Sequence, residues 1–369
     1  MGANFDHNAS TPLAAEALDK MLPYLQSLYG NPSSLHQSGR VAKSAIETAR
    51  AELAECINCY PDQIIFTSGG TESNKLVLNY VSQLESAVGS VEHASVLENI
   101  SSSASNLSYV PVNEQGVYQI VGLPDVKFIS IQYVNNETGV VQPVAELRKT
   151  CQNALLHVDA SQAVGKLKVD FLDLGIDFMT LSAHKFNGPK GVGALVVKDP
   201  ISFSALQKGG YQESSKRAGT ENVAAIVGMG HAATLLKQNL PQRIEKITKL
   251  RDHFEQQLMK IPGVTIFSSS VERVSNTCFF ALPFFHGETF LMECDRAGFE
   301  LASGSACHSS VTEPSHVLKA MGIDESIAIN AIRASFGVNN TVQQIDEFIQ
   351  FINNKLENLP VSIKSVAGF

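Results

Sequence analysis

The chain has 369 residues, of which 44% are hydrophobic and 17% are charged, and its formal net charge is −8. This composition is typical of a globular protein with a large core, and the length predicts two domains. The acidic balance argues against broad contact with nucleic acid or an anionic membrane, because such contact needs clustered Lys and Arg. We therefore expect no direct nucleic acid binding and no membrane association.

The first residues, Met1–Asp6, lack the basic start and the apolar core of an export signal. No apolar run reaches the length that spans a bilayer. These features predict a cytoplasmic protein whose six cysteines are reduced. Cys56 and Cys59 have redox or metal spacing, but no second Cys pair accompanies them and the stretch is typical of a helix end. No metal site is expected.

Apolar runs alternate with helix-period segments from about residue 11 to 250, which predicts a mostly parallel sheet covered by helices. The clearest strands are 64–67, 128–131, 155–158, 178–181 and 194–197. A helix follows over roughly 240–259. Beyond it a smaller α+β domain is predicted, with strands at 264–267 and 277–280 and helices near 288–296 and 341–356.

We place the large domain at 13–250 and the small domain at 251–369, with residues 1–12 packing near the small one.

Two predicted strands end in charged residues of opposite sign. The run 155–158 is followed by Asp159, and the run 178–181 leads into Lys185 and a Gly-Pro-Lys-Gly turn. Because an open α/β sheet presents its functional groups at the carboxyl ends of its strands, the two side chains should face one crevice. An amine that forms a Schiff base and an acid beside a ring nitrogen suit pyridoxal phosphate. The alternative is an ordinary surface Lys and a strand-end Asp.

A glycine pair follows the strand at 64–67, in the order Ser68, Gly69, Gly70, Thr71, before a helix predicted to begin near Asn74. Glycine lets the backbone approach a ligand closely, and the free amides of a helix start bind phosphate. A plain capped turn is the alternative.

Two further polar positions follow apolar runs. His93 could stack on a flat cofactor ring and move protons, or be a satisfied structural histidine. Asn136 could bond a ring hydroxyl, or belong to an ordinary Asn-rich turn.

The predicted small domain contributes a thiol and a guanidinium. Cys307 lies among Gly and Ser residues, which favours an accessible, nucleophilic thiol over a buried one. Arg333 could clamp a substrate carboxylate with two hydrogen bonds, or form a surface salt bridge.

Taken together, these residues resemble a cysteine desulfurase of the NifS/IscS type, in the class V aminotransferase group of fold-type I pyridoxal phosphate enzymes. The resemblance runs nearly end to end, through the segments 6–12, 30–34 and 217–222 to Arg333. It implies a large domain with a mostly parallel seven-stranded sheet and a smaller α+β domain.

The resemblance also implies roles for individual residues. Lys185 would form the Schiff base with pyridoxal 5'-phosphate, Asp159 would pair with the ring nitrogen, and His93 would stack on the ring. The other implied cofactor contacts are Gln162 and Asn136 on the hydroxyl side, and Gly70, Thr71, Ser182, His184 and, from the second subunit of a homodimer, Thr220 at the phosphate. The implied substrate contacts are Arg333, Asn8 and Asn31.

The implied reaction converts L-cysteine to L-alanine and leaves a persulfide on Cys307. The freed Lys185 amine would take the α-proton, and the Cys307 thiolate would attack the substrate sulfur. The Cys307 loop resembles the long, swinging loop of group I members. The sulfur would pass to an acceptor protein, in iron–sulfur cluster assembly or tRNA thiolation.

The chain departs from the family pattern at a few positions. Relatives usually have Gly-Gly-Gly-Gln-Glu-Arg-Gly where this chain has Tyr211, Ser214 and Ser215 in that motif, which puts the turn's shape and a subunit contact in doubt. Ala334 replaces a common Phe beside Arg333, and Ser10 replaces Thr.

Two other functions compete with this prediction. A selenocysteine lyase or aminotransferase would not use Cys307 as a covalent carrier, so alanine production would survive its removal. A catalytically idle dimeric scaffold would form no cofactor adduct on Lys185.

Overall fold

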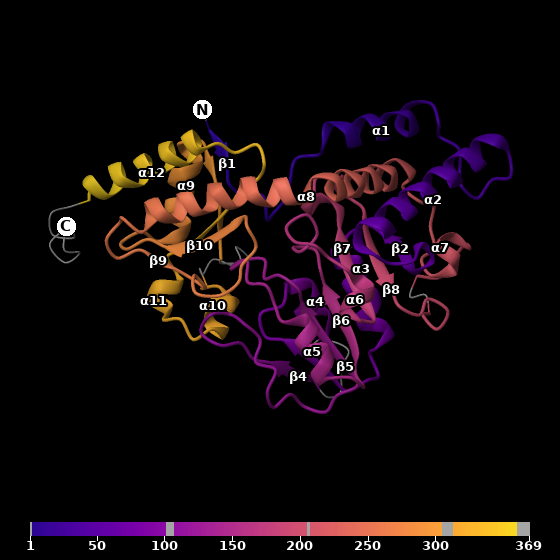
Figure 1. Ribbon diagram of the computed structural model, residues 1–369, viewed down its shortest axis with the longest axis horizontal. Coiled ribbons are helices and arrows are strands. Elements are labelled where there is room, and N and C mark those ends of the chain that lie inside the picture. The colour runs from indigo at the N-terminus through magenta and orange to yellow at the C-terminus, as the bar shows by residue number, and fades with distance from the viewer. Residues whose placement is uncertain (1, 101–106, 205–206, 305–312, 360–369) are drawn as a thin grey trace.

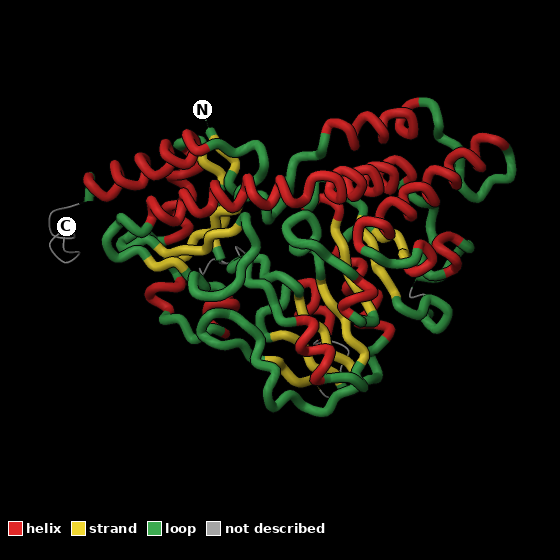
Figure 2. Tube along the Cα trace, in the orientation of Figure 1, coloured by secondary structure: helices red, strands yellow, loops and turns green. Residues whose placement is uncertain are grey.

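The computed structural model describes residues 2–100, 107–204, 207–304 and 313–359 (Figure 1). The structure has a large sheet and a smaller sheet that lie apart from each other. The long helix α8 (Val223–Leu258) runs past both of them (Figure 2). The arrangement is the α/β architecture that the sequence predicts.

The larger sheet has seven strands in the order β2-β8-β7-β6-β5-β3-β4. They span Ile64–Thr67 (β2), Gly193–Val197 (β8), Phe178–Ser182 (β7), Leu155–Asp159 (β6), Phe128–Gln132 (β5), Ser86–Gly89 (β3) and Leu107–Val110 (β4). Only β8 runs opposite to the other six strands of this sheet, so the predicted mostly parallel seven-stranded sheet is confirmed. The strands β5, β7 and β8 are buried along their whole length, which explains why they appear in the sequence as continuous apolar runs.

Helices and short 3-10 turns precede, connect and follow these strands along the chain. They are α1 (Ala15–Gln26), α2 (Gln37–Ile57), η1 (Pro61–Gln63), α3 (Gly70–Tyr80), α4 (Ala94–Ile100), α5 (Val144–Thr150), α6 (Phe171–Leu174), η2 (Ala183–Lys185) and α7 (Gln212–Ser215). The helix that we predicted near Asn74 begins four residues earlier, because Gly69 takes a backbone conformation with φ of +155° that directs the chain into a helix at once.

The helix α8 has 36 residues and begins well before the predicted residue 240. The first half of α8 is rich in Ala and Gly and lacks the stripe of large apolar residues by which a helix is recognised in a sequence. These small residues allow close packing: a Cβ at Gly228 would lie 2.5 Å from Met21 Sδ of α1, and one at Gly230 would lie 2.6 Å from Ala49 Cα of α2.

The second half of α8 packs on the smaller, antiparallel sheet. That sheet has the order β12-β13-β10-β9, spanning Ala302–Ser303, Ala331–Ser335, Thr277–Ala281 and Thr265–Ile266. A two-stranded ribbon joins β1 (Ala3–Asn4) to β11 (Phe299–Glu300), and the remaining helices are α9 (Gly287–Arg296), α10 (His316–Ala320), α11 (Glu325–Ala328) and α12 (Val342–Glu357).

The two halves of α8 belong to different apolar clusters. Its residues up to Leu236 join the cluster under the large sheet, whereas those from Ile247 onward join an aromatic cluster that also contains Phe5 and Phe348. The N-terminal segment thus packs with the C-terminal part of the chain. The domain boundary at residue 250 stays a prediction, because α8 belongs to both clusters.

The segment that departs from the family motif forms a turn with an unusual backbone at α7. Glu213, Ser214 and Ser215 have φ values of 46°, 54° and 64°, in the left-handed region that favours glycine. The turn is held by Glu213, whose carboxylate accepts two hydrogen bonds from Arg50, at 2.8 and 2.9 Å, and one from the Phe66 amide at 2.8 Å. The buried ion pair of Glu213 with Arg50 therefore holds a turn whose non-glycine residues have left-handed backbones.

Replacing Ser215 by glycine should stabilise the protein. Ser215→Gly removes a left-handed strain but gives the unfolded chain more freedom, so we expect the free energy of unfolding to rise by about 0.5–1 kcal/mol. Urea unfolding measures this change. The matched control is Ser44→Gly, at an exposed position inside α2, which should lower the same quantity by a similar amount. A Ser215→Gly protein no more stable than wild type would contradict the prediction.

Candidate active site

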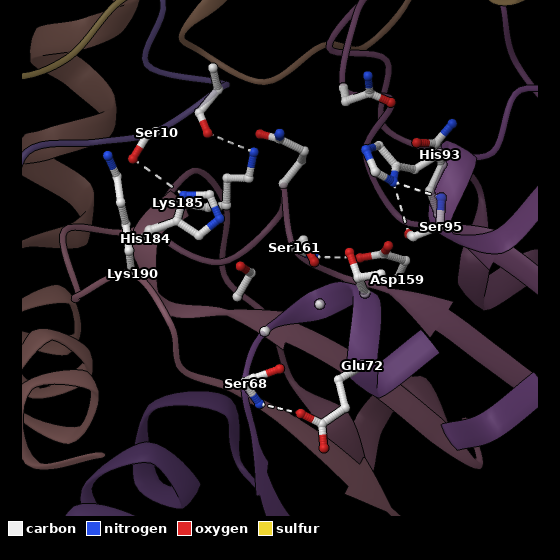
Figure 3. Close-up of a pocket in the computed structure, with 18 of the residues that line it drawn as sticks. Ser10, Ser68, Glu72, His93, Ser95, Asp159, Ser161, His184, Lys185 and Lys190 are labelled. Atoms are coloured by element: carbon white, nitrogen blue, oxygen red, sulfur yellow. Dashed lines mark hydrogen bonds between the residues drawn. The ribbon is translucent and has the colours of Figure 1, made fainter. Parts of the chain in front are cut away.

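A cavity of about 610 Å³ opens at the carboxyl ends of the large sheet's central strands, beside the start of α3 (Figure 3). Nine residues that we predicted from the sequence line it: Gly70, Thr71, His93, Asn136, Asp159, Gln162, Ser182, His184 and Lys185. In the view of Figure 3, Lys185 lies on one side of the opening, and His93 and Asp159 lie on the other.

The start of α3 forms one corner of this cavity. The first amides of a helix have no acceptor within it, so those of Gly70 and Thr71 are free to bind an anion. A Cβ at Gly70 would lie 3.0 Å from Ser161 Oγ, so glycine brings the backbone close to the polar side chains opposite. Bare amides facing hydroxyl groups suit a phosphate group.

Glu72 braces the loop before α3. Its carboxylate accepts a hydrogen bond from the Ser68 amide at 2.7 Å and one from Arg217 Nε at 2.8 Å. Burial acts to raise the pKa of Glu72, but these hydrogen bonds outweigh it and lower the pKa below its ordinary value. The charged carboxylate therefore fixes Ser68 at the cavity wall.

Asp159, at the end of β6, is buried and receives hydrogen bonds from neutral donors. Asn74 Nδ2 donates to its Oδ2, and the Ser161 amide donates to its Oδ1, both at 2.9 Å. Two residues before it, His157 lies between Ser130 and Thr180, and burial lowers the pKa of this histidine to about 4. The acid therefore has an uncharged support and can pair with a cationic ring nitrogen.

His93 is held in one tautomer. Its Nδ1 accepts a hydrogen bond from the Ser95 amide at 3.1 Å, so the neutral ring carries its proton on Nε2. Ser95 Oγ lies 2.8 Å from the same Nδ1 and accepts from Asn74 Nδ2 at 2.9 Å. Burial lowers the pKa of His93, which favours this neutral form.

Sequence reasoning missed Asn74 and Ser95, although they connect Asp159 to His93. The sequence shows only an asparagine shortly before the apolar run Leu76–Leu78, and the structure adds that Asn74 is buried in the first turns of α3. A polar residue on the buried side of a helix needs a partner, and here Asp159 and Ser95 supply it.

Lys185 ends the short turn η2 and points its amine at the N-terminal segment. Its Nζ donates to the carbonyl oxygens of Asn8 at 2.7 Å and Ala9 at 2.9 Å. Burial, together with the positive charge of Arg333, lowers the pKa of Lys185 to about 8. Its neighbour His184 contacts Ser10 Oγ at 3.3 Å, and burial and the Lys185 charge lower its pKa to about 4.

Two predicted substrate contacts lie behind the cavity wall. Asn8 is 1% exposed, and its side chain is bonded to Lys166, Asn276 and Thr277. Arg333, on β13, donates to Asp6 Oδ1 at 2.7 Å and to the Asn136 carbonyl at 2.9 Å, while its Nε has no partner among the described residues. The family departure at Ala334 faces away from this site, into the aromatic cluster.

The remaining predicted residues do not line this cavity. Asn31 is exposed, and Thr220 is exposed beside a second cavity of about 230 Å³ that shares Ser68 and Gly191 with the first. Cys307 lies outside the described residues. The roles that we assign to these three, like the roles of the residues that line the cavity, stay predictions.

The cysteine pair with redox or metal spacing does not line the cavity. Cys56 and Cys59 flank the end of α2, and burial raises their thiol pKa values to about 11 and about 12. In the described part of the chain, no group of three or more His, Cys, Asp or Glu residues could hold a metal ion. Within the same residues, every helix is too short or too polar to cross a bilayer.

The sequence profile of the class-V aminotransferases matches residues 3–348. The chain belongs to the aminotransferase class-V family. This family uses pyridoxal phosphate, and the cavity offers what such a cofactor needs: an amine, an acid supported by neutral donors, and free helix amides.

Similar proteins narrow this assignment. A Dictyoglomus turgidum protein named cysteine desulfurase IscS is 39% identical over 371 residues, which cover 96% of this chain and 94% of that protein. The X-ray structure of a NifS-like protein from Rickettsia africae has a TM-score of 0.90 and 33% identity, covering 97% of this chain and 100% of that one. A structure of SspA in complex with cysteine has a TM-score of 0.80 and 29% identity, covering 92% and 99%. The predicted likeness to the NifS/IscS type of cysteine desulfurase is confirmed.

The lowered pKa of Lys185 predicts an amine that reacts near neutral pH. A lysine with a pKa of about 8 is roughly one-tenth neutral at pH 7, against about one in three thousand for an ordinary lysine. We expect an amine-specific reagent to label Lys185 of the cofactor-free protein with a half-maximal rate near pH 8, as measured by mass spectrometry of the Lys185 peptide. A lysine in a free peptide is the control, and its rate should still rise above pH 9. A Lys185 rate that follows the free peptide would contradict the prediction.

Proposed function

We propose that this class-V family member is a pyridoxal phosphate-dependent cysteine desulfurase that converts L-cysteine to L-alanine and carries the sulfur as a persulfide on Cys307. The observation that carries this proposal is the convergence of the Lys185 amine, the Asp159 carboxylate and the α3 amides on one cavity. The relatives named cysteine desulfurase support the choice of substrate, as does the similar SspA structure, which is a complex with cysteine.

The cavity residues would hold the cofactor in the following way. Its phosphate would bind the amides of Gly70 and Thr71 and the side chains of Ser182 and His184, with Thr220 of a second subunit. Asn136 and Gln162 would bind the ring hydroxyl, Asp159 the ring nitrogen, and His93 the ring face. When bound, pyridoxal phosphate supplies an electron sink that acidifies the substrate Cα–H bond and accepts electrons from it.

Lys185 would act as the base for the Cα proton. Its amine is already held 2.7 Å from the Asn8 carbonyl oxygen, and its pKa of about 8 leaves a usable neutral fraction at physiological pH. His93 would present an Nε2–H donor to the cavity, because Ser95 occupies its Nδ1. The two groups would therefore have different roles: Lys185 would accept a proton, and His93 would donate a hydrogen bond.

Arg333 would bind the substrate carboxylate. Its guanidinium is buried and shares one side with Asp6, at 2.7 Å, and its Nε has no partner in the described part of the chain. A buried guanidinium N–H without a hydrogen-bond acceptor costs free energy. A substrate carboxylate would supply that acceptor. Asn31 would complete the substrate contacts, whereas Asn8, whose side chain is fully bonded behind the cavity wall, would act through its carbonyl oxygen on Lys185.

The described residues on either side of the Cys307 segment lie near the cavity residue Asn136. Before it, Ala302 pairs with Arg333 across β12 and β13, and a Cβ at Gly304 would lie 3.1 Å from Glu137 Oε2. After it, Ser315 Oγ donates to the same Glu137 carboxylate. Glu137 follows the cavity residue Asn136, so both contacts support delivery of Cys307 to the substrate.

The sulfur transfer is balanced without an external oxidant. The Cys307 thiolate attacks the substrate Sγ, an S–S bond forms, and the Cβ–Sγ bond breaks. The electron pair of the broken bond stays with the carbon fragment, which takes up protons and leaves as alanine. The persulfide sulfur then passes to an acceptor protein of iron–sulfur cluster assembly or tRNA thiolation.

We also propose that the active form is a cytoplasmic homodimer. Thr220 and Asn31 are exposed on a single chain, and the small cavity beside Thr220 shares two lining residues with the active-site cavity. A second subunit packed over this face would bring Thr220 to the neighbouring phosphate site.

Exposure to L-cysteine should place sulfur on one thiol. We expect mass spectrometry of the purified, cofactor-loaded protein to find an adduct of one or more sulfur atoms on the Cys307 peptide, removable by dithiothreitol. Cys307→Ala should lower alanine formation at least about 100-fold, because the nucleophile is lost. The control Cys151→Ala, at a partly buried thiol outside the cavity, should keep wild-type alanine formation.

Alanine formation and borohydride trapping separate the competing functions. Alanine formation that survives in Cys307→Ala would indicate a lyase without a covalent carrier. Absence of a borohydride-trapped adduct on wild-type Lys185 would indicate a scaffold without cofactor chemistry.

A further inference from the structure

A second lysine is buried directly behind the cavity. Lys166 follows the cavity residue Gln162 by four positions and is only 6% exposed. Burial lowers the pKa of Lys166 well below that of an ordinary lysine, and the nearby positive charges of Lys185 and Arg333 act in the same direction. Burial of an amine costs free energy unless hydrogen bonds compensate for the lost water.

The backbone around Lys166 is fixed. Gly165 has a φ of +83°, and a Cβ there would lie 3.0 Å from Phe186 Cβ, so the turn requires glycine. Arg243 of α8 donates from Nε to the Gly165 carbonyl oxygen at 2.9 Å. Lys166 therefore leaves its backbone from a turn that is held from two sides.

The Lys166 amine donates hydrogen bonds to two side-chain amides. It lies 2.5 Å from Asn8 Oδ1 and also donates to Gln162 Oε1. Because Lys166 presents N–H donors, both amides turn their oxygen atoms toward it. The amine thus selects one of the two possible orientations of each amide.

The orientation of Gln162 matters for the cavity. With Oε1 on Lys166, its Nε2 points the other way and donates to the Asn8 carbonyl oxygen at 2.9 Å. The same carbonyl oxygen accepts from Lys185 Nζ at 2.7 Å. An amide nitrogen has two N–H groups, so Gln162, which lines the cavity, keeps one donor for a ligand.

We propose that Lys166 is a positioning residue: its buried amine orients the Gln162 amide so that an N–H donor faces the cofactor, and it holds the Asn8 carbonyl beside Lys185. The hydrogen bonds form a closed ring from Lys166 through Gln162 to the Asn8 backbone and back through the Asn8 side chain. Apolar packing alone would be served by methionine, which fills a similar volume without donating a hydrogen bond.

This inference rests on the proposed cofactor, and its test measures cofactor binding rather than activity. The cofactor-free protein is titrated with pyridoxal phosphate, and the dissociation constant is read from the absorbance of the bound form. Lys166→Met should weaken binding about 10-fold, the loss typical of removing a supporting hydrogen bond. The matched control is Lys168→Met, at an exposed lysine two residues along the same segment, which should bind as wild type does.

A double-mutant cycle distinguishes positioning from general damage. If Lys166 acts through Gln162, then Lys166→Met should weaken binding much less in a Gln162→Ala background than in wild type. Equal losses in both backgrounds, or wild-type binding by Lys166→Met, would overturn the proposal. Circular dichroism and thermal unfolding check that each variant folds.

A second substitution keeps the test decisive if Lys166→Met does not fold. Lys166→Gln retains an N–H donor, so it should bind pyridoxal phosphate more tightly than a folded variant without one, such as Lys166→Leu, and its effect should also shrink in Gln162→Ala. The reverse order would overturn the proposal. Failure of the wild-type protein to form a borohydride-trapped adduct on Lys185 would instead refute the proposed function.

Discussion

The contact between the Lys185 amine and the backbone of the N-terminal segment is the interaction on which the site depends. The carbonyl oxygens of Asn8 and Ala9 accept hydrogen bonds from the amine, and the segment that carries them packs against it. The same segment enters the aromatic cluster of the small sheet through Phe5. Burial of one amine on the large sheet therefore depends on packing that belongs to the other sheet, and this burial gives Lys185 its low pKa.

Charge around this contact is unevenly distributed. The positive charges of Lys185, Arg333 and Arg243 act on Lys166, and that of Arg333 acts on Lys185, whereas Asp6 is the carboxylate paired with Arg333. An excess of positive charge at the floor of a cavity favours anionic ligands and neutral amines. Both consequences suit an enzyme that must bind an amino acid carboxylate beside a lysine that works without its proton.

The sequence made the main site residues predictable because they stand where apolar runs stop. Asp159 and Lys185 were found in this way, and so was the glycine pair before α3. Asn74 and Ser95 were not found, since a polar residue inside a helix gives no sign of which way it faces. Lys166 and Lys168 look alike in sequence, and only the fold buries the first. The start of α8 was also missed. Its first half is rich in Ala and Gly, lacks an apolar stripe in the sequence, and packs through close approach of its backbone to neighbouring helices.

The long helix α8 has a consequence for how the molecule comes apart. A single continuous segment supplies Met229 to one interior and Phe254 to the other, so loosening either interior frees a helix that the other needs. Two sheets linked by a flexible tether could melt one after the other. Sheets that share a helix lose their order together, so the chain should denature as one cooperative unit with a single heat-absorption peak.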